Sequence, residues 1–429
     1  MSLGLFFGAL VVLLVLGVPI CAVFSAVTVL PALLDPSFPY AADAAVRSMV
    51  SGLNSFPLMA IPLFILAGVI MAKGKISERL FNVFSFFIGN KTAGLPCAVT
   101  ITCLFYGAIS GSGPATTAAV GAMCIPLLTS VGYDLVFSTA LVAVSGSLGI
   151  IIPPSIPYIM YCNASGASVS QMFLAGILPG LLIAFCLMLY SFVYCKLHGE
   201  DKEKLRAQYQ ALRDKGLRVV LREGFWALLA PVIILGGIYG GVCSPTEAAT
   251  ISIFYALVIS LFVYRSISLR DLPGILLEGV RTYAPILFII SAAVAFSRVI
   301  TMLNVAAAVS EAVLGLISSR VVILLLINVL LLFVGMIMDT GPAILVFTPV
   351  LLPIVKAIGV DPIHFGILMC VNLAIGFVTP PMGANLFVAS NLSKVSVIEI
   401  AKKAVPFICA FLIALALITF VPAISLCLL

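Results

Sequence analysis

Long apolar segments separated by short polar connections make up almost the whole chain of 429 residues. A helix needs about 20 consecutive apolar residues to cross the hydrocarbon core of a bilayer, so this length allows about ten crossings. The pattern predicts membrane spans over 56–72, 169–195, 225–239, 248–263, 283–300 and 404–429. Residues 1–34 form either one kinked span or two short ones, because Gly17-Val18-Pro19 splits them.

Two apolar segments are interrupted near their middle by small and polar residues that include a helix-breaking Gly-Pro. The first interruption is Ser-Gly-Ser-Gly-Pro-Ala-Thr-Thr at 110–117, the first tip, and the second is Met-Asp-Thr-Gly-Pro-Ala at 338–343, the second tip. Irregular backbone at membrane depth is tolerated only where it is buried in protein or lines a cavity. The pattern therefore predicts a binding site at the two tips, each within a re-entrant helical hairpin, 92–131 and 321–358.

Two further spans are each broken by a pair of prolines, at Pro153-Pro154 within 133–162 and at Pro380-Pro381 within 362–392. Each proline removes a backbone donor and clashes with the preceding helical turn.

A surface helix is predicted over 73–91 on the cytoplasmic side, and 305–318 is suited to a second one. Residues 35–55 are predicted to be a mixed loop. Ser-Pro-Thr-Glu at 244–247 matches a helix capping box, which explains Glu247 without a role in transport.

The two halves of the chain are related by an internal repeat. The tips align at an offset of 228 residues (341 − 113), and the Gly, Asp and Pro-Pro positions that follow align at 227 (380 − 153). Lys and Arg cluster at 73–91, 196–223, 265–281 and 394–403, and the positive-inside rule places all four clusters in the cytoplasm when the halves are oppositely oriented. The sequence therefore predicts an all-α polytopic membrane protein with two inverted repeats, each with a re-entrant hairpin and a broken helix, as in secondary transporters.

The repeat also suggests a division of the chain. We expect scaffold helices of the first repeat at 1–55, and a transport domain in the remainder of that repeat at 56–195. Residues 196–223 form a basic cytoplasmic connector, interpreted as a solvated helix rather than a docking site for a partner. Scaffold helices of the second repeat follow at 224–282, and its transport part at 283–429.

Composition excludes several classes of protein. The chain is 63% hydrophobic and 9% charged, against about 25% charged residues in soluble domains, and its mean hydropathy is +1.28. The eleven cysteines form no Cys-x-x-Cys pair, and the two histidines are far apart, so a metal centre or a His-based nucleophile is not expected. The first basic residue is Arg47, so the N-terminus lacks the basic region of a cleaved signal peptide. The net charge of +6 reflects topology rather than nucleic-acid binding.

The tips suggest two Na⁺ sites. Half-helices that meet at a tip expose N–H groups, which attract anions, and carbonyl groups, which attract cations. The predicted ligands of the first site come from the first tip, the span after it and its break: Ser110, Gly111, Gly113, Thr117, Ser145, Gly146 and Pro153. Those of the second site are Asp339, Gly341, Gly376, Thr379 and Pro380, with Asn385 beside them.

Asp339 is the only acid well inside an apolar segment. Because a charge at membrane depth is costly, we favour a role as ion ligand or proton carrier over a role as helix cap. Asp134 and Asp361, in contrast, open their spans and are predicted to be caps. Candidate substrate contacts are the hydroxyl and amide side chains of Ser112, Thr116, Ser155, Asn163, Thr340 and Asn385, each of which could equally join two helices.

The tips, the two Pro-Pro breaks, the segment Gly-Val-Cys-Ser-Pro-Thr-Glu-Ala-Ala at 241–249 and the order of parts resemble the large membrane subunit (DctM family) of tripartite ATP-independent periplasmic transporters. The resemblance covers essentially the whole chain. It implies an elevator-type, Na⁺-coupled importer of the ion transporter superfamily in the bacterial inner membrane. It also implies two partners, a small four-helix membrane subunit and a periplasmic binding protein that delivers organic acid anions such as C4-dicarboxylates or sialic acid.

Other classes fit the residues less well. A stand-alone Na⁺/anion symporter of the same superfamily would need no binding protein. A channel is a further alternative, because polar re-entrant tips also build selectivity filters. A membrane-embedded hydrolase would need a paired base and nucleophile or a metal cluster, which the sequence does not supply. An ATP-driven pump would need a P-loop, and residues 68–75 have five residues between the glycines rather than four.

Overall fold

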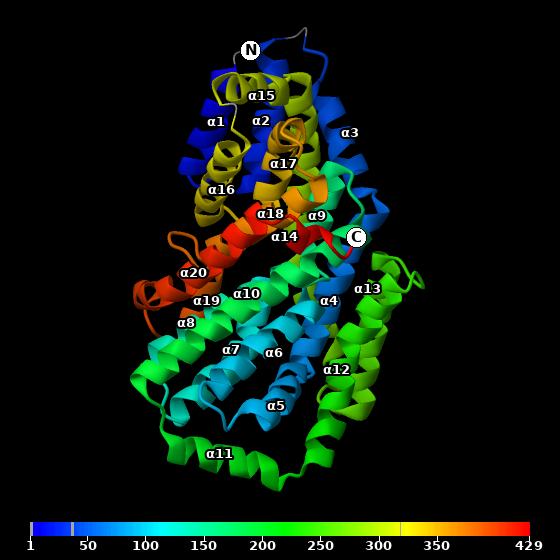
Figure 1. Cartoon of the computed structure of the whole chain (residues 1–429). Helices are drawn as coiled ribbons and strands as arrows, with labels where there is room; N and C mark the ends of the chain where they lie inside the picture. Colours follow the sequence, from blue (N-terminus) through cyan, green and yellow to red (C-terminus); the bar gives the residue numbers. More distant parts are fainter. Residues whose placement is uncertain (1–2, 36–37, 318) are drawn as a thin grey trace.

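The computed structural model describes residues 3–35, 38–317 and 319–429, and every regular element in these ranges is a helix (Figure 1). By length and composition, 8 helices of the described ranges are suited to crossing a membrane, and shorter apolar helices accompany them. The chain is therefore an all-α polytopic membrane protein, as the sequence predicts.

The N-terminal half begins with short helices and continues with the first hairpin and its broken span. Its elements are α1 Leu3–Val15, α2 Ile20–Leu34, α3 Ala42–Leu53, η1 Phe56–Met59, α4 Ala60–Lys73, α5 Ile76–Ile88, α6 Gly94–Ser110, α7 Gly113–Ser130, α8 Leu135–Gly146, η2 Ser147–Ile150, α9 Ile156–Ser165 and α10 Val169–His198. Residues 1–34 contain two short helices, because the chain turns at Gly17, whose φ is +77°.

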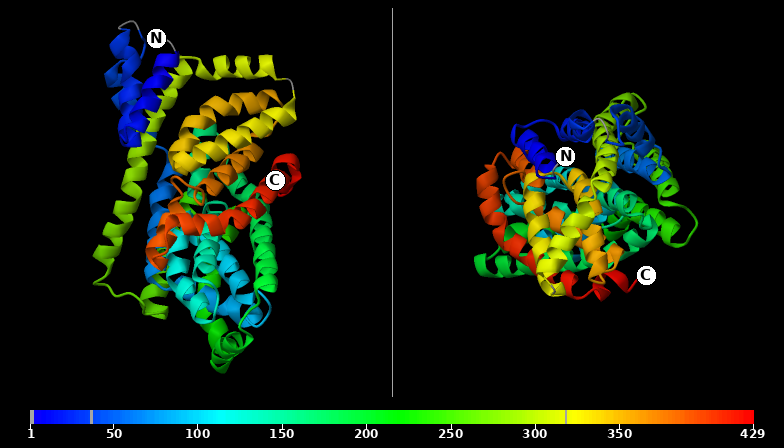
Figure 2. Two further views of the ribbon diagram at one scale, coloured as in Figure 1. Left: turned by 90° about the vertical axis from the view of Figure 1, so that its left-hand side faces the viewer. Right: turned by 90° about the horizontal axis from the view of Figure 1, so that it is seen from above.

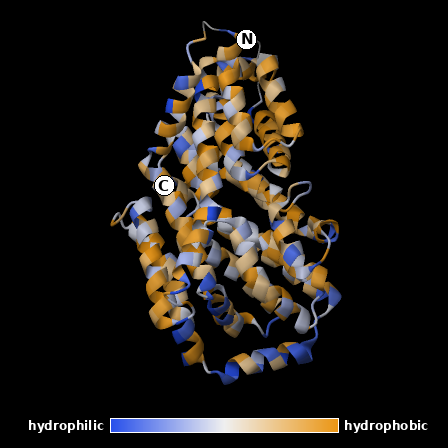
Figure 3. Cartoon of the chain, turned by 180° about the vertical axis from the view of Figure 1, so that it is seen from behind, coloured by the Kyte–Doolittle hydropathy of each residue, from blue (hydrophilic) through white to orange (hydrophobic). Residues whose placement is uncertain are grey.

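The C-terminal half repeats this order after a connector helix. Its elements are α11 Lys202–Asp214, α12 Leu217–Tyr239, α13 Pro245–Val258, the π-helical turn η3 Ile259–Val263, α14 Leu272–Met302, α15 Val305–Leu316, α16 Arg320–Ile337, α17 Thr340–Ala357, α18 Pro362–Gly376, α19 Ala384–Ser393, α20 Val397–Phe420 and α21 Ala423–Leu426. Figure 3 shows the connector α11 rich in hydrophilic residues at one end of the molecule, below largely apolar helices. Most residues of α11 are exposed.

The long helix α14 joins one group of helices into a scaffold. It packs along α2, α3 and α4, and α4 in turn packs on α13. Phe296 of α14 stacks on Phe24 of α2 with their ring centroids 4.9 Å apart. Figure 2 shows α14, in yellow-green, running along one side of the molecule. We call α2, α3, α4, α12, α13 and α14 the scaffold helices, so α4 and the second half of α14 are grouped with the scaffold because of their packing, although the sequence analysis assigned 56–72 and 283–300 to the transport parts.

The two hairpins enter the molecule from opposite ends. In Figure 1, α6 and α7 rise from the lower end, which carries α11, and α16 and α17 descend from the upper end. The two repeats also exchange helices: α9, which follows the first break, packs on α17, and α19, which follows the second break, packs on α7 and α8. Each broken span is thus completed against the hairpin of the other repeat.

Two glycine pairs bring each hairpin against the break of its own repeat. A Cβ built on Gly107 of α6 would lie 2.7 Å from the Cα of Gly149, and one built on Gly376 would lie 2.1 Å from the carbonyl oxygen of Gly335 in α16. The two pairs occupy equivalent places in the repeats, at offsets of 228 (335 − 107) and 227 (376 − 149). Only glycine permits backbones to approach so closely, and neither Gly107 nor Gly335 was predicted to do so from the sequence.

Several predicted boundaries are wrong. The predicted loop at 35–55 contains α3, because good helix formers and an i, i+4 ion pair between Asp43 and Arg47, 2.8 Å long, stabilise a helix there; residues 36 and 37 lie outside the described ranges. Helix α14 begins at Leu272, so Arg281 lies on a helix rather than in a loop, and the expected boundary at 282/283 falls inside α14. The basic residue near the start of this helix was mistaken for part of a connection.

The ends of other spans also differ from the prediction. The basic connector is shorter than 196–223, since α10 continues to His198 and α12 already begins at Leu217. The last span begins at Val397 rather than at 404, so two lysines at 402 and 403 lie on its first turns. The predicted surface helix at 305–318 is present as α15, although Ser318 itself lies outside the described residues.

Candidate functional site

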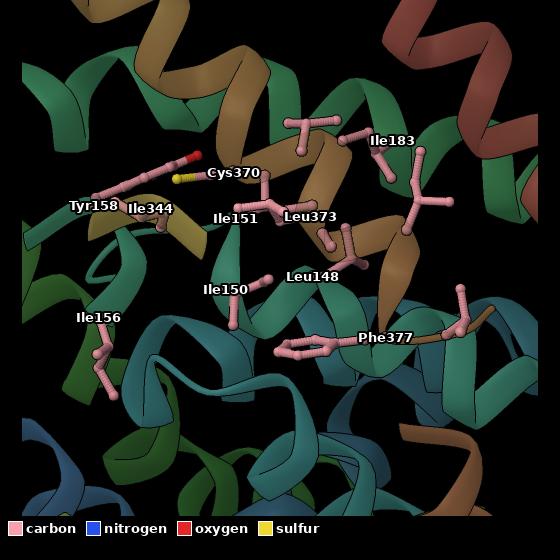
Figure 4. Close-up of a cluster of buried hydrophobic side chains, with 14 of the residues drawn as sticks. Leu148, Ile150, Ile151, Ile156, Tyr158, Ile183, Ile344, Cys370, Leu373 and Phe377 are labelled. Atoms are coloured by element: carbon pink, nitrogen blue, oxygen red, sulfur yellow. The ribbon is translucent and has the colours of Figure 1, made fainter. Parts of the chain in front are cut away.

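The two tips meet at one cavity of about 240 Å³, which we call the tip cavity. Both repeats contribute to its lining: Gly111, Ser112, Pro114, Ile150, Ile156, Pro157 and Met160 come from the first, and Thr282, Ile286, Ile289, Asp339, Thr340, Gly341, Pro342 and Phe377 from the second. Figure 4 shows Ile150 and Phe377, from the two breaks, beside each other. The predicted convergence of two polar breaks on a shared pocket is therefore present.

Three helices begin at the tip cavity. The first residues of α9 and α17 and Pro114 in the first turn of α7 all line it. The N-terminus of a helix carries unpaired N–H groups and a partial positive charge, which stabilise an anion. The lining residues of the described structure include no Lys or Arg, so these backbone dipoles are the main attraction that the cavity offers to an anion.

The first tip is held by its own hydroxyl groups. The Ser110 and Thr116 hydroxyls lie 2.9 Å apart, and Thr116 Oγ1 donates to the carbonyl of Ser112 over 2.8 Å. Gly111 turns the chain between the two arms at a φ of +62°, a conformation that favours glycine. The Ser112 side chain accepts a hydrogen bond from the Ala115 N–H and so caps α7. Of these groups, Ser112 reaches the cavity, whereas Thr116 is buried behind it.

Behind the first tip lie two buried oxygens that lack a partner. Thr117 and Asn385 are both fully buried, and neither Thr117 Oγ1 nor Asn385 Oδ1 has a hydrogen-bond partner among the described residues. Each oxygen lies against a glycine: a Cβ built on Gly146 would be 2.0 Å from Thr117 Oγ1, and one on Gly113 would be 3.3 Å from Asn385 Oδ1. Buried oxygens without partners are rare in native proteins, so each of the two is a candidate ligand for a cation.

Asn385 belongs to the first tip and not to the second, so its predicted placement is wrong. Its Nδ2 donates to the Ala143 carbonyl over 3.0 Å and to Ser147 Oγ over 3.2 Å. The reason is the exchange of helices between the repeats, which places α19 on α7 and α8. Ser145, a predicted ligand of the same site, is fully buried with its hydroxyl 3.1 Å from that of Thr100.

Asp339 caps α17 and also reaches the tip cavity. Its Oδ1 accepts a hydrogen bond of 2.7 Å from the Thr340 N–H, and the Thr340 hydroxyl lies 3.4 Å from the same oxygen. Gly341 follows on the cavity wall, where a Cβ would approach the Met160 sulfur to 3.1 Å. The second tip therefore presents a carboxylate to a cavity that also holds the N-terminus of a helix.

The other residues predicted at the two breaks lie outside the tip cavity. The Thr379 hydroxyl donates to the Ile375 carbonyl one turn earlier, Gly376 packs on Gly335, and Pro380 is exposed. In the first break, Pro153 is buried, and Ser155 Oγ donates to the Ile150 carbonyl and caps α9.

Asn163 lies near the far end of α9, where its Oδ1 accepts a hydrogen bond of 3.3 Å from Ser55. It is therefore not brought to the tips.

The predicted caps elsewhere are confirmed. Asp134 accepts a 2.8 Å hydrogen bond from the Phe137 N–H, and Asp361 accepts one of 2.7 Å from the Ile363 N–H. Ser244 and Glu247 form the capping box. The apolar part of the cavity wall, above all Ile286 and Ile289 of α14, was not predicted, because nothing in an apolar span distinguishes a residue that faces a cavity from one that faces lipid.

Comparisons with known proteins agree with this arrangement. The family model of "Tripartite ATP-independent periplasmic transporter, DctM component" matches residues 7–424. The chain is 43% identical over 425 residues to the isethionate TRAP transporter permease protein DctMQ of Oleidesulfovibrio alaskensis, covering 98% of this chain and 65% of that protein. It is 36% identical to the C4-dicarboxylate TRAP transporter large permease protein DctM of Rhodobacter capsulatus, covering 100% of this chain and 99% of the relative.

A third relative is the 2,3-diketo-L-gulonate TRAP transporter large permease protein YiaN of Escherichia coli, 34% identical over 88% of this chain and 87% of its own length. Among solved structures, the Alcanivorax borkumensis YdaH transporter shares the fold, with a TM-score of 0.67 at 16% identity over 95% of this chain and 97% of that one. These relatives are transport proteins and not enzymes. The chain therefore belongs to the DctM family, the large permease component of tripartite ATP-independent periplasmic transporters, which work with a small membrane subunit and a periplasmic binding protein.

Proposed function

We propose that the chain imports a small organic acid anion together with Na⁺ across the bacterial inner membrane. The observation that supports this most directly is the tip cavity, where tips from both repeats meet beside two buried oxygens without partners in the described structure. In the proposed elevator mechanism, the hairpins and broken helices carry the cavity past the scaffold helices. Inverted repeats with broken helices and a central site are typical of secondary transporters.

Two groups of residues fit Na⁺. At the first tip, Thr117 Oγ1 and Asn385 Oδ1 would hold the ion with the nearby backbone around Gly146. At the second tip, the Asp339 carboxylate would hold it, as the N-terminal cap that faces the cavity. The Na⁺ gradient across the membrane would supply the energy for transport, because Na⁺ would cross together with the anion. The donors are oxygens, and the described residues contain no cluster of three His, Cys, Asp or Glu side chains suited to a transition metal.

Asp339 gives a physical reason for coupling. Its carboxylate and the helix N-termini of the tip cavity face the same space, so an uncompensated Asp339 repels the anion that the N-termini attract. A cation on Asp339 removes this repulsion and so strengthens anion binding. In the same way, a bound anion strengthens binding of the cation. Transport of either species alone is then disfavoured, as symport requires.

The names of the relatives suggest the substrate class. They refer to isethionate, C4-dicarboxylates and 2,3-diketo-L-gulonate, all small organic anions. A cavity of about 240 Å³ without Lys or Arg in its described lining suits a compact anion bound by backbone dipoles. Sialic acid stays a prediction from the family resemblance, since the relatives described above do not name it. The partners we propose are a four-helix membrane subunit and a periplasmic binding protein that delivers the anion.

Reconstitution tests this function. The chain would be purified with the small membrane subunit of its host and placed in liposomes, and uptake of radiolabelled isethionate and succinate would be measured with and without the binding protein. We expect uptake only with an inward Na⁺ gradient and the binding protein. Uptake that a K⁺ gradient supports equally well would contradict Na⁺ coupling. Uptake without the binding protein would instead indicate a stand-alone symporter.

A further inference from the structure

Three cavities lead from the tips to the end of the molecule that carries α11. The tip cavity shares Ser112, Pro114, Ile156, Thr282 and Ile286 with a second cavity of about 470 Å³, the passage. The passage shares Lys73 and Glu278 with a third cavity of about 520 Å³, the mouth, which is otherwise lined by Ser266, Ile267, Arg270, Asp271, Gly274 and Ile275. The positive-inside rule places this end in the cytoplasm.

The passage lies between a moving wall and a fixed wall of the proposed elevator. Helix α7 of the first hairpin contributes Ala115, Ala118 and Ala119, which share one helical face and leave room beside it. The opposite wall consists of the scaffold helices α4 and α14. Along α14, residues at 278, 282 and 286 recur every four positions and so face the passage one above the other, changing from Glu through Thr to Ile.

Lys73 is the first cation on this route. The described lining of the tip cavity contains no Lys or Arg, and that of the passage contains Lys73 alone. Its Nζ lies 3.1 Å from Glu278 Oε2, and the two side chains are 50% and 51% exposed. Such a solvated ion pair contributes little to stability, because water screens both charges. A carboxylate or sulfonate that arrives from the tip cavity can therefore replace Glu278 as the partner of Lys73 at little cost.

The other charges at the mouth are consistent with this exchange. Asp271 directs its carboxylate to the Ser268 N–H and hydroxyl, both at 2.8 Å, and so offers less repulsion to an anion in the cavity. Arg270 adds a second cation further out on the mouth. A departing anion thus meets Lys73 and then Arg270, with Glu278 ready to pair with Lys73 again.

We propose that Lys73 is a release site for the transported organic anion, and that Glu278 closes this site by pairing with Lys73 when the anion has left. This inference rests on the proposed function for the identity of the ligand. The route itself can be tested without a substrate, because electrostatics at the mouth affect any charged probe that enters from the cytoplasm.

The probe is a thiol placed at Thr282, which lines both the tip cavity and the passage. The Thr282→Cys variant, as the full transporter in inside-out membrane vesicles, would be treated with the anionic sulfonatoethyl or the cationic trimethylammonioethyl methanethiosulfonate. Mass spectrometry of the peptide that carries the introduced thiol measures how fast each of the two reagents modifies this thiol. None of the native cysteines lines the three cavities within the described residues, so their reaction does not obscure the result.

We expect the introduced thiol to react from the cytoplasmic side. The further substitutions are made in the Thr282→Cys variant. Lys73→Gln should lower the ratio of the modification rate with the anionic reagent to that with the cationic reagent by about three- to fivefold. Glu278→Gln should raise this ratio by a similar factor. Lys75→Gln is the matched control, since this exposed lysine lies two residues away and lines none of the three cavities. An unreactive thiol at position 282, or equal ratios in the variants at positions 73 and 75, would overturn the proposal.

Transport supplies a second measurement. In proteoliposomes with the binding protein, Lys73→Gln should lower the maximal rate of isethionate uptake with little change in the half-saturating concentration, while Lys73→Arg should retain the wild-type rate. An unchanged maximal rate in Lys73→Gln would contradict a release site. Absence of Na⁺-driven uptake in the wild type would instead refute the proposed function, and the thiol rates would still decide whether the route exists.

Discussion

The Asn385 side chain donates a 3.0 Å hydrogen bond to the carbonyl of Ala143, although 242 residues separate the two along the chain. Asn385 follows the second break, and Ala143 precedes the first. The bond fixes the amide so that its Oδ1, which has no hydrogen-bond partner among the described residues, lies beside Gly113. One repeat thereby supplies a side chain to the candidate ion site of the other.

The buried oxygens behind the first tip predict specific losses of Na⁺ affinity. Thr117→Val preserves the shape of the side chain but removes Oγ1, and should raise the half-maximal Na⁺ concentration for uptake on the order of tenfold, the effect of losing one ligand interaction. Thr102→Val is the control, because Thr102 is equally buried but its hydroxyl already donates to the Ala98 carbonyl. Titration of uptake against Na⁺ checks this. Equal Na⁺ dependence in the two variants would exclude Thr117 as a ligand.

Gly146 predicts a steric effect at the same place. A Cβ there would lie 2.0 Å from Thr117 Oγ1, so Gly146→Ala should destabilise the fold by about 1–3 kcal/mol, as overpacking does. At Gly236 of α12 a Cβ would meet no described atom within 4 Å. Gly236→Ala should therefore be neutral or stabilise by up to about 1 kcal/mol through helix propensity. Thermal unfolding of the purified transporter compares the variants, and identical midpoints would contradict the packing described here.

Asp339 can be separated from its role as a cap. Asn caps a helix about as well as Asp, so Asp339→Asn should unfold at the wild-type temperature while losing Na⁺-dependent uptake by at least about tenfold. A loss of this size corresponds to about 1.4 kcal/mol. Asp361→Asn is the matched change at the cap of α18 and should alter neither property. Wild-type uptake in Asp339→Asn would show that the carboxylate serves only as a cap.

Glu200 holds the base of the first hairpin together. Its Oε1 accepts hydrogen bonds from the Ala93 N–H at 3.0 Å and from the Tyr133 hydroxyl at 2.5 Å. Glu200→Ala leaves both donors without this partner and should cost about 1–3 kcal/mol of stability. Glu203→Ala, at an exposed residue one turn away, should cost far less. Chemical denaturation distinguishes the two variants, and equal stability would show that the base of the hairpin does not depend on Glu200.

The same contact predicts how stability depends on pH. Burial, and then the hydrogen bond to Glu200, raise the pKa of Tyr133 above its ordinary value. A raised pKa favours the neutral phenol in the folded state, so its contribution is fully present below the ordinary Tyr pKa of about 10 and is lost as the pH rises through the folded value. The stability difference between wild type and Tyr133→Phe should therefore be constant from about pH 6 to pH 9. A difference that falls within this range would contradict the assignment.

The sequence predicts those parts of the site that have a local cause. Gly-Pro and Pro-Pro pairs interrupt a helix wherever they occur, and Ser or Asp before an apolar run caps one, so the tips, the breaks and the caps at Asp134 and Asp361 could be recognised without a structure. Opposite orientation of the halves follows from charge. These features require no knowledge of which helices touch.

Contacts between distant helices could not be predicted in this way. Asn385 was expected beside the second tip because it follows the second break, but helix packing places it beside the first. The close approaches at Gly107 and Gly335 are invisible in sequence because glycine is common in membrane helices. Ile286 and Ile289 of α14 have the same composition whether they face lipid or a cavity.

The exchange of α9 and α19 between the repeats has a consequence for how such a chain could have arisen. A protein with one repeat alone would leave the face of its hairpin without the helix that covers it here. Two copies of that protein, inserted upside down relative to each other, would cover both faces reciprocally. The two repeats therefore make with each other, in one polypeptide, the contacts that two oppositely inserted copies of a single repeat would make between separate chains.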